Sequence, residues 1–177
     1  MSKTITVFGS SQPKPGEKDY ITAYKLGRIL GEINYKVCSG GYQGIMDAVS
    51  KGAKDMGSEA IGVTVDIYGA KPSEHLTEHI ECHSLFERLE TLLNKGDGYI
   101  ILPGGTGTML ELALVWEYLN KGLMPLKPVA CLGGMWTRIV AEMDIRMEQE
   151  ERETGLIRCY NTIEECAEFV CSKLDNG

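Results

Sequence analysis

The sequence lacks any run of about twenty consecutive apolar residues, and its basic side chains are outnumbered by acidic ones. Without such a run we expect no membrane-spanning helix. Eighteen lysines and arginines stand against 25 aspartates and glutamates, which gives a net charge of −7. A surface for nucleic acid or for an anionic membrane needs a basic field, so we expect neither partner. A phosphorylated small molecule remains compatible, because backbone N–H groups bind phosphate whatever the net charge.

Paired cysteines and a secretion-type leader are also missing. The six cysteines form no C-x-x-C pair; they are Cys38, Cys82, Cys131, Cys159, Cys166 and Cys171. The first three residues lead directly into a strand-like stretch, so we expect no targeting segment. A disulfide framework is not expected in a 177-residue chain of this kind. We therefore expect a cytoplasmic protein with reduced thiols, several of which fill the core.

Four candidate metal ligands lie close together in the sequence: His75, His79, Cys82 and His83. The first two are four residues apart and would share one face of a helix, a spacing that suits a metal. However, a strand predicted at 79–83 would scatter these side chains. We therefore interpret them as ordinary loop histidines, and we expect neither a metal nor another cofactor.

The hydrophobic pattern alternates between short β-rich runs and longer segments with helical spacing. The predicted strands are 4–8, 35–38, 60–65, 79–83, 98–102, 128–132 and 157–160. The predicted helices are 18–33, a segment from the second glycine-rich loop to about 56, 85–95, 109–120, 136–150 and 162–174. Repeated strand–helix units predict a doubly wound parallel sheet with helices on both faces. We expect one Rossmann-like α/β domain over residues 1–177 that binds a nucleotide-like ligand.

The most informative feature is the loop Pro103-Gly104-Gly105-Thr106-Gly107-Thr108, which follows a fully apolar strand. Glycines allow unusual dihedral angles and let a phosphate approach the backbone. The two threonines are expected to cap the next helix, whose N-terminus favours an anion. A tight turn without a ligand is the alternative interpretation.

Two further loops are expected beside it. Ser39-Gly40-Gly41-Tyr42-Gln43-Gly44 follows the second strand, and Gly9-Ser10-Ser11 follows the first. Because the carboxyl ends of parallel strands meet at one edge of the sheet, these loops should converge on one crevice. Neither the P-loop pattern nor G-x-G-x-x-G is present, so NAD chemistry is not indicated.

Two charged residues flank this crevice in the prediction. Glu111 is expected in the first turn of the helix after the main glycine loop. It either complements the helix dipole or handles a proton or a sugar hydroxyl in the crevice. Arg88 is predicted on the helix 85–95, where a solvated face is the alternative to a functional role.

The motif P-G-G-x-G-T-x-x-E formed by residues 103–111 resembles that of the LOG (Lonely Guy) family and its wider Rossmann-like superfamily, also labelled lysine decarboxylase-like. Phe8-Gly9-Ser10-Ser11 is similar to the G-S-S of the family's first strand. The segment 39–46 is similar to its G-G-x-x-G-[LI]-M loop, and Arg88 matches the arginine of its R-K motif.

The resemblance implies an activity. LOG proteins hydrolyse the N-glycosidic bond of nucleoside 5′-monophosphates and release a free base and ribose 5-phosphate. By position, the glycine-rich loops would hold the 5′-phosphate, and Arg88 and Glu111 would be the catalytic pair. The resemblance also implies a homodimer, and a carboxylate near the ribose suits an oxocarbenium-like transition state.

Leu89 departs from the family pattern, which has lysine after the arginine. A missing cation should weaken ligand binding or alter specificity. Some members of the superfamily are carriers of molybdenum cofactor, a phosphorylated pterin. A non-catalytic carrier or sensor of a phosphorylated nucleotide or pterin is therefore the alternative function.

Overall fold

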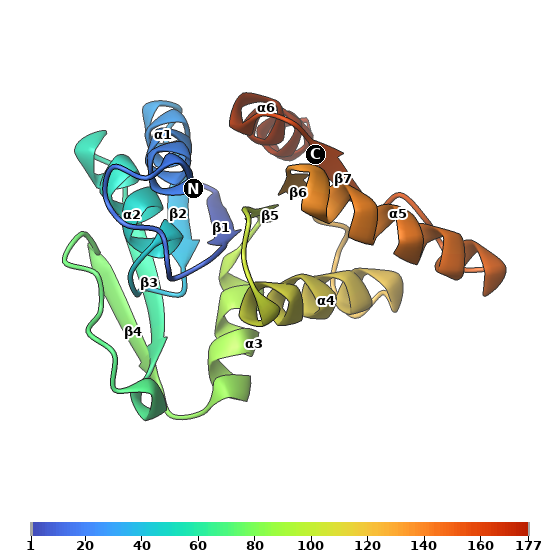
Figure 1. Cartoon of the computed structure of the whole chain (residues 1–177), viewed down its shortest axis with the longest axis horizontal. Helices are drawn as coiled ribbons and strands as arrows, with labels where there is room; N and C mark the ends of the chain where they lie inside the picture. Colours follow the sequence, from blue (N-terminus) through green and yellow to red (C-terminus); the bar gives the residue numbers. More distant parts are fainter. Residues whose placement is uncertain (1, 177) are drawn as a thin grey trace.

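The computed structural model describes residues 2–176. One sheet of seven parallel strands forms its centre, in the order β4-β3-β2-β1-β5-β6-β7. The strands are β1 (Thr4–Phe8), β2 (Lys36–Ser39), β3 (Ala60–Val65), β4 (Glu78–Cys82), β5 (Gly98–Ile101), β6 (Val129–Leu132) and β7 (Ile157–Tyr160). The predicted doubly wound α/β fold is confirmed (Figure 1).

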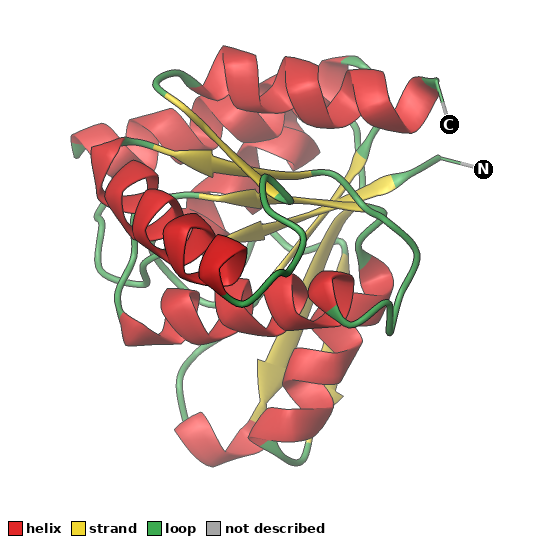
Figure 2. Cartoon of the chain, turned by 90° about the vertical axis from the view of Figure 1, so that its right-hand side faces the viewer, coloured by secondary structure: helices red, strands yellow, loops and turns green. Residues whose placement is uncertain are grey.

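Helices cover the sheet on both sides (Figure 2). They are α1 (Lys18–Glu32), α2 (Ile45–Asp55), α3 (Leu85–Lys95), α4 (Thr106–Asn120), α5 (Gly134–Gln149) and α6 (Ile163–Asp175), with a short 3-10 helix η1 (Asp66–Tyr68) after β3. Helices α1, α2 and α6 pack on one face of the sheet and share one hydrophobic core. Helices α3, α4 and α5 pack on the other face and form a second core.

The central strands are buried on both faces of the sheet. All five residues of β1 and all four residues of β5 are buried. Such strands are near-continuous apolar runs in parallel sheets, which is why the sequence pattern located them. Strand β1 pairs with β2 on one side and with β5 on the other. The strand order therefore reverses between β1 and β5, and ligands of open α/β sheets bind outside such a switch point.

Helix α4 begins earlier than its sequence pattern predicted. The prediction placed its start at residue 109, whereas the helix starts at Thr106. The segment Thr106-Gly107-Thr108 carries no apolar periodicity, so the pattern could not reveal that it is the first helical turn. Within residues 2–176, no helix combines the length and the apolar character that a membrane crossing requires.

Candidate active site

A crevice of about 490 Å³ opens at the carboxyl ends of β1 and β5. Its lining residues come from five separate segments of the chain: Gly9, Ser10, Ser11, Gln12, Tyr42, Met46, Tyr68, Ala70, Arg88, Gly105, Thr106, Gly107, Thr108 and Glu111. A volume of this order suits a small-molecule ligand. The first strand loop and the main glycine loop therefore meet where the sequence predicted a shared crevice.

The N-terminus of α4 faces this crevice. Its N-cap is Gly105, which has no side chain, and within residues 2–176 neither threonine caps the helix. The prediction that Thr106 and Thr108 cap α4 is wrong, because both lie inside its first turn. The backbone N–H groups of residues 106–108 have no acceptor within the helix. Together with the positive end of the helix dipole, they form a place for an anion.

The loop after β1 is held against this helix end by backbone hydrogen bonds. The Ser10 amide donates to the Pro103 carbonyl at 3.1 Å, and the Ser10 carbonyl accepts from the Ile45 amide at 2.9 Å. The Ser10 hydroxyl accepts from the Gln12 amide at 3.1 Å. The first residues of the loop are therefore fixed between β5 and the start of α2, and Ser10 and Ser11 face the crevice.

The remaining predicted loop residues shape the crevice from behind it. Gly40, Gly41, Gly44, Pro103 and Gly104 are not among its lining residues. A Cβ on Gly40 would lie 2.0 Å from Nη2 of the buried Arg88, and a Cβ on Gly104 would lie 2.1 Å from the Thr108 hydroxyl. Gly44 has φ +71° and approaches the Ser10 carbonyl. These glycines make room for neighbouring groups that do reach the crevice.

Arg88 is buried, with only 6% of its surface exposed. The solvated helix face considered from the sequence is therefore wrong. Its Nε donates to the Val63 carbonyl at 2.9 Å, and its Nη2 donates to the Gly40 carbonyl at 3.3 Å. The third nitrogen, Nη1, lies 3.6 Å from Oε1 of Glu111. A buried guanidinium fixed in this way holds its charge at one point of the crevice wall.

Glu111 is the sixth residue of α4, so it lies in the second turn and not in the predicted first turn. Complementation of the helix dipole is strongest in the first turn and does not account for this position. Burial raises the pKa of the Glu111 carboxyl from 4.5 to about 7, while the positive charge of Arg88 acts in the opposite direction. A carboxyl group that titrates near neutrality, in a crevice and beside a fixed cation, is typical of acid–base sites.

The whole arrangement can be compared with known proteins. The chain matches the family described as SLOG cluster4 over residues 2–166. The protein belongs to the SLOG cluster4 family. This membership confirms the resemblance to the LOG family and its superfamily that the sequence motifs indicated.

Among curated relatives, this SLOG chain is 32% identical to the cytokinin riboside 5′-monophosphate phosphoribohydrolase of Rhodococcoides fascians over 124 residues, which are 67% of this chain and 63% of that protein. It is 36% identical to the pyrimidine/purine nucleotide 5′-monophosphate nucleosidase of Escherichia coli K12 over 107 residues, 54% of this chain and 23% of that protein. The chain thus spans less than two thirds of either relative.

Among solved structures, the molybdenum cofactor carrier protein from Chlamydomonas reinhardtii matches with a TM-score of 0.80 at 21% identity, over 99% of both chains. At this identity the match shows a shared fold alone.

Several crevice residues of this SLOG protein were missed by the sequence reasoning: Gln12, Tyr42, Met46, Tyr68 and Ala70. Tyr42 lies within the glycine-rich loop 39–44, but nothing in the sequence indicated that its ring would face Arg88. Tyr68 and Ala70 belong to a polar loop that was predicted only as a connection. Their proximity depends on how the segment after β3 folds back, which no local pattern records.

The other residues considered from the sequence lie outside the crevice. His79 contacts the Thr64 hydroxyl at 2.7 Å, and His83 contacts Asp66 at 2.9 Å. Among the described residues no group of three or more His, Cys, Asp or Glu side chains could hold a metal ion. Cys38 is fully buried, and burial raises its thiol pKa to about 12, as expected of a structural thiol. Leu89 is buried and does not line the crevice.

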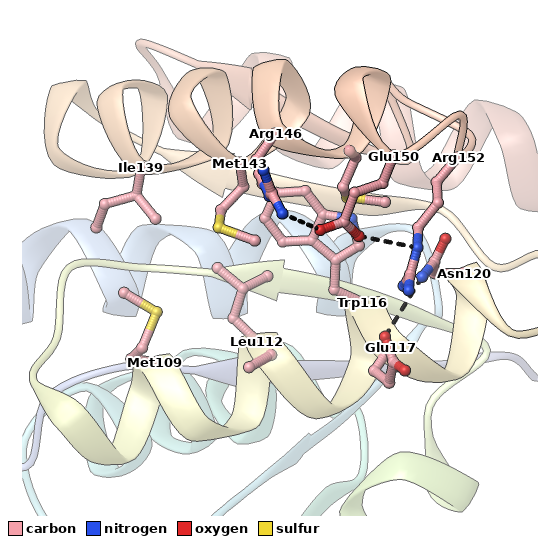
Figure 3. Close-up of a pocket in the computed structure, with 12 residues that line it drawn as sticks. Met109, Leu112, Trp116, Glu117, Asn120, Ile139, Met143, Arg146, Glu150 and Arg152 are labelled. Carbon is pink, nitrogen blue, oxygen red and sulfur yellow. Dashed lines mark hydrogen bonds and ion pairs between the residues drawn. The ribbon is translucent and has the colours of Figure 1, made fainter.

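A second cavity of about 370 Å³, the α4–α5 groove, lies between these two helices (Figure 3). Apolar side chains form most of it, including Met109, Leu112 and Met143, and Arg146, Glu150 and Arg152 pair at one end. Trp116 also lines the groove and is buried. The groove extends to the C-terminal ends of α4 and α5, where Asn120 and Glu150 line it, and within residues 2–176 no helix N-terminus is among its lining residues.

Proposed function

We propose that this protein hydrolyses the N-glycosidic bond of a nucleoside 5′-monophosphate and releases the free base and ribose 5-phosphate. One observation carries the proposal: the buried Glu111–Arg88 pair faces the same crevice as the uncapped start of α4. The first feature suits a cationic transition state, and the second suits a phosphate. Few other ligand classes would need both within one small cavity.

In this proposal, the 5′-phosphate binds at the N-terminus of α4. The N–H groups of residues 106–108 and the hydroxyls of Ser10 and Ser11 donate to its oxygens. The residues assigned to phosphate binding are those predicted from the sequence. Gly9 and residues 105–108 line the crevice. The loops behind it are shaped by Gly40, Gly41, Gly44, Pro103 and Gly104. This arrangement needs no net positive surface, in keeping with the chain's charge of −7.

Glu111 then acts on the ribose. As the bond from C1′ to the base nitrogen lengthens, positive charge develops on C1′ and the ring oxygen. An ionised carboxylate in a water-poor crevice stabilises that charge strongly. The same carboxylate accepts a proton from the attacking water, whose oxygen bonds to C1′ as the bond from C1′ to the base nitrogen breaks. The carboxyl group then passes this proton, through solvent, to the departing base nitrogen.

Arg88 is a positioning residue in this scheme. Two of its nitrogens are already engaged by the Val63 and Gly40 carbonyls, so it has little capacity left for a phosphate. Its remaining nitrogen faces Glu111. Arg88 therefore favours the ionised form of the carboxyl group, against the larger effect of burial, and fixes its orientation.

The names of the relatives support this reaction class. The proteins from Rhodococcoides fascians and Escherichia coli are named for action on nucleoside 5′-monophosphates, one on a cytokinin riboside and the other on pyrimidine and purine nucleotides. The base that this chain prefers is therefore part of the experimental question.

The proposal is tested with purified protein and AMP, GMP, CMP, UMP and an N6-modified AMP, by following free base and ribose 5-phosphate chromatographically. We expect base release that falls by about 10²- to 10⁴-fold in Glu111→Ala. Glu117→Ala is the matched control, because Glu117 lies on the same helix, outside the crevice, in an exposed ion pair with Lys121. No release from any nucleotide would refute the hydrolase.

A carrier or sensor of a phosphorylated nucleotide or pterin is the second candidate. The sequence suggested it because Leu89 stands where the family has lysine, and the fold shared with a molybdenum cofactor carrier protein is compatible with it. The same crevice would then hold an intact ligand. Tight retention of an unchanged ligand without turnover would support the carrier over the hydrolase.

We further propose that residues 1–177 act as one domain, in a cytoplasmic homodimer. The six cysteines, all of which lie in the described residues, are free thiols. Apolar side chains on α4 and α5 support self-association, since Leu110, Met143 and Ile145 are each at least 44% exposed. The α4–α5 groove gives these helices a recessed apolar surface that a second copy could cover.

A further inference from the structure

An exposed aromatic ring stands at one end of the crevice, away from the proposed phosphate site. Tyr68 is the last residue of η1 and lines the crevice, and 50% of its surface is exposed. The ring keeps this exposure although Tyr42 and Arg88 are its neighbours. It leaves a flat apolar surface free to contact a ligand.

The position of this ring is set by a buried support. The Tyr42 hydroxyl donates to the Val65 carbonyl at 2.7 Å and accepts from the Val65 amide at 2.8 Å, so Tyr42 is fixed to the end of β3. The Tyr42 and Tyr68 ring centroids are 5.9 Å apart. The Arg88 Cζ lies 5.8 Å from the Tyr42 ring centroid and 5.9 Å from that of Tyr68.

The base of η1 is held as well. Asp66, its first residue, contacts His83, which directly follows β4, at 2.9 Å. The pKa of His83 is raised by its hydrogen bond to Asp66 and by that residue's charge, which favours a charged pair. Tyr68 therefore projects from a turn anchored at both its start and its inner face.

Tyr68 and the start of α4 line the same crevice but follow different strands of the sheet. Helix η1, which carries Tyr68, follows β3, and β5 leads to the start of α4, with β2 and β1 between the two strands. Arg88 links the ring to Glu111, because its Cζ lies 5.9 Å from the Tyr68 ring centroid and its Nη1 lies 3.6 Å from Oε1 of Glu111. A ligand whose phosphate binds at α4 and whose sugar reaches Glu111 would place its base toward Tyr68.

We propose that Tyr68 is the stacking platform for the nucleobase and sets the preference among bases, an inference that rests on the proposed function. Stacking on an aromatic ring tolerates any base, because every base has a π face. The larger face of a purine gains more from the contact than that of a pyrimidine. The crevice thus selects a class of substrates, purine nucleoside monophosphates ahead of pyrimidine ones, through contact area at this ring.

Equilibrium binding tests the proposal without turnover. Titration calorimetry in a Glu111→Gln background measures AMP, CMP and ribose 5-phosphate, which has no base. We expect Tyr68→Ala to weaken the binding of AMP by about tenfold or more and the binding of CMP by less. The affinity for ribose 5-phosphate should stay within about twofold. Tyr68→Trp should retain AMP binding.

Ile67→Ala is the matched control, because Ile67 is the neighbouring residue of η1, is 64% exposed and does not line the crevice. The proposal is overturned if Tyr68→Ala keeps its affinity for AMP. It is also overturned if the variant loses affinity for ribose 5-phosphate as much as for AMP, since that result indicates a collapsed loop. A background protein that binds neither AMP nor ribose 5-phosphate would refute the proposed function itself. One that binds both equally would refute only the stacking platform.

Discussion

Two opposite effects determine the ionisation of the Glu111 carboxyl group. Burial favours the neutral form of Glu111, and the guanidinium of Arg88 favours the ionised form. Burial dominates, so the pKa is raised to about 7. The carboxyl group therefore changes charge within the physiological pH range, and both stability and activity should respond.

Glu111 should make stability depend on pH. Its pKa is higher in the folded protein than its usual value of 4.5, so the folded state binds its proton more tightly. The stabilisation is complete at low pH and is lost as pH rises through about 7. The free energy of unfolding of the wild type, relative to Glu111→Gln, should thus fall between pH 5 and pH 8 in urea titrations. A difference that stays constant with pH would contradict this assignment.

Arg88 should set the pH at which activity appears. If ionised Glu111 is the active form, kcat/KM for base release should rise with pH through about 7. Arg88→Met removes the charge that lowers the Glu111 pKa, so the rise should move to higher pH. Arg88→Lys, which keeps a charge, should shift it less. An unshifted profile with a lower plateau would mean that Arg88 supports the fold without tuning the carboxyl group.

At the scale of elements, the loops that form the site depend on close approaches at glycines. The carbonyl of Gly40 ends β2 and accepts from Arg88, and its missing side chain leaves space for the same guanidinium. The loop after β2 and helix α3 therefore fit together only around the arginine. This packing links a turn on one strand to a charge on a helix.

Gly40→Ala should disturb the site without touching a ligand. The added Cβ would lie 2.0 Å from Arg88 Nη2 and 2.7 Å from Met46 Sδ, so the guanidinium must move away from Glu111. We expect a loss of about ten- to hundredfold in kcat/KM, by analogy with overpacked cores. Gly134→Ala on α5 is the control, because its nearest neighbour would be 3.6 Å away. Unchanged activity in Gly40→Ala would show that Arg88 has more freedom than its contacts indicate.

The sequence predicted the elements better than it predicted their ends and contacts. The five inner strands were located because buried parallel strands are short apolar runs ended by glycine or polar residues, whereas the edge strands β4 and β7 are partly exposed and were located from their place in the alternating pattern. The start of α4 was missed because Thr106 to Thr108 show no apolar period. The burial of Arg88 could not be predicted, since it depends on a missing side chain at Gly40, 48 residues away. Tyr68 was missed for a similar reason, because its place in the crevice depends on its contacts with Tyr42, in the loop after β2, and with Arg88.

At the scale of the whole molecule, the sheet order brings the N-termini of α2 and α4 to one edge of the sheet. The reversal between β1 and β5 places α2 and α4 on opposite faces, so their N-termini meet above the switch point. Helix α4 also borders the α4–α5 groove along its length. The same helix thus carries Glu111 near its start and, further on, the surface proposed for self-association.

Met143→Glu should dissociate the proposed homodimer. Met143 lines the groove and is 44% exposed, so a carboxylate there would place charge in a covered apolar surface. Light scattering coupled to size exclusion should report a dimer for the wild type and a monomer for this variant. Ile21→Glu is the control, since Ile21 is 42% exposed on α1, across the sheet. A monomeric wild type would exclude the dimer.

The contacts of Arg88 also bear on how proteins of this design diversify. The guanidinium joins β3 and the loop after β2 through the Val63 and Gly40 carbonyls, so replacing Arg88 should affect the packing of the site as well as the ionisation of Glu111. Tyr68 projects from the rim with half its surface free. Replacements there should carry little penalty in foldedness. If the proposed function holds, substitutions at Tyr68 should alter the choice of base while Arg88 and Glu111 are kept, and a mutant library aimed at new substrates should begin at Tyr68 and Ala70.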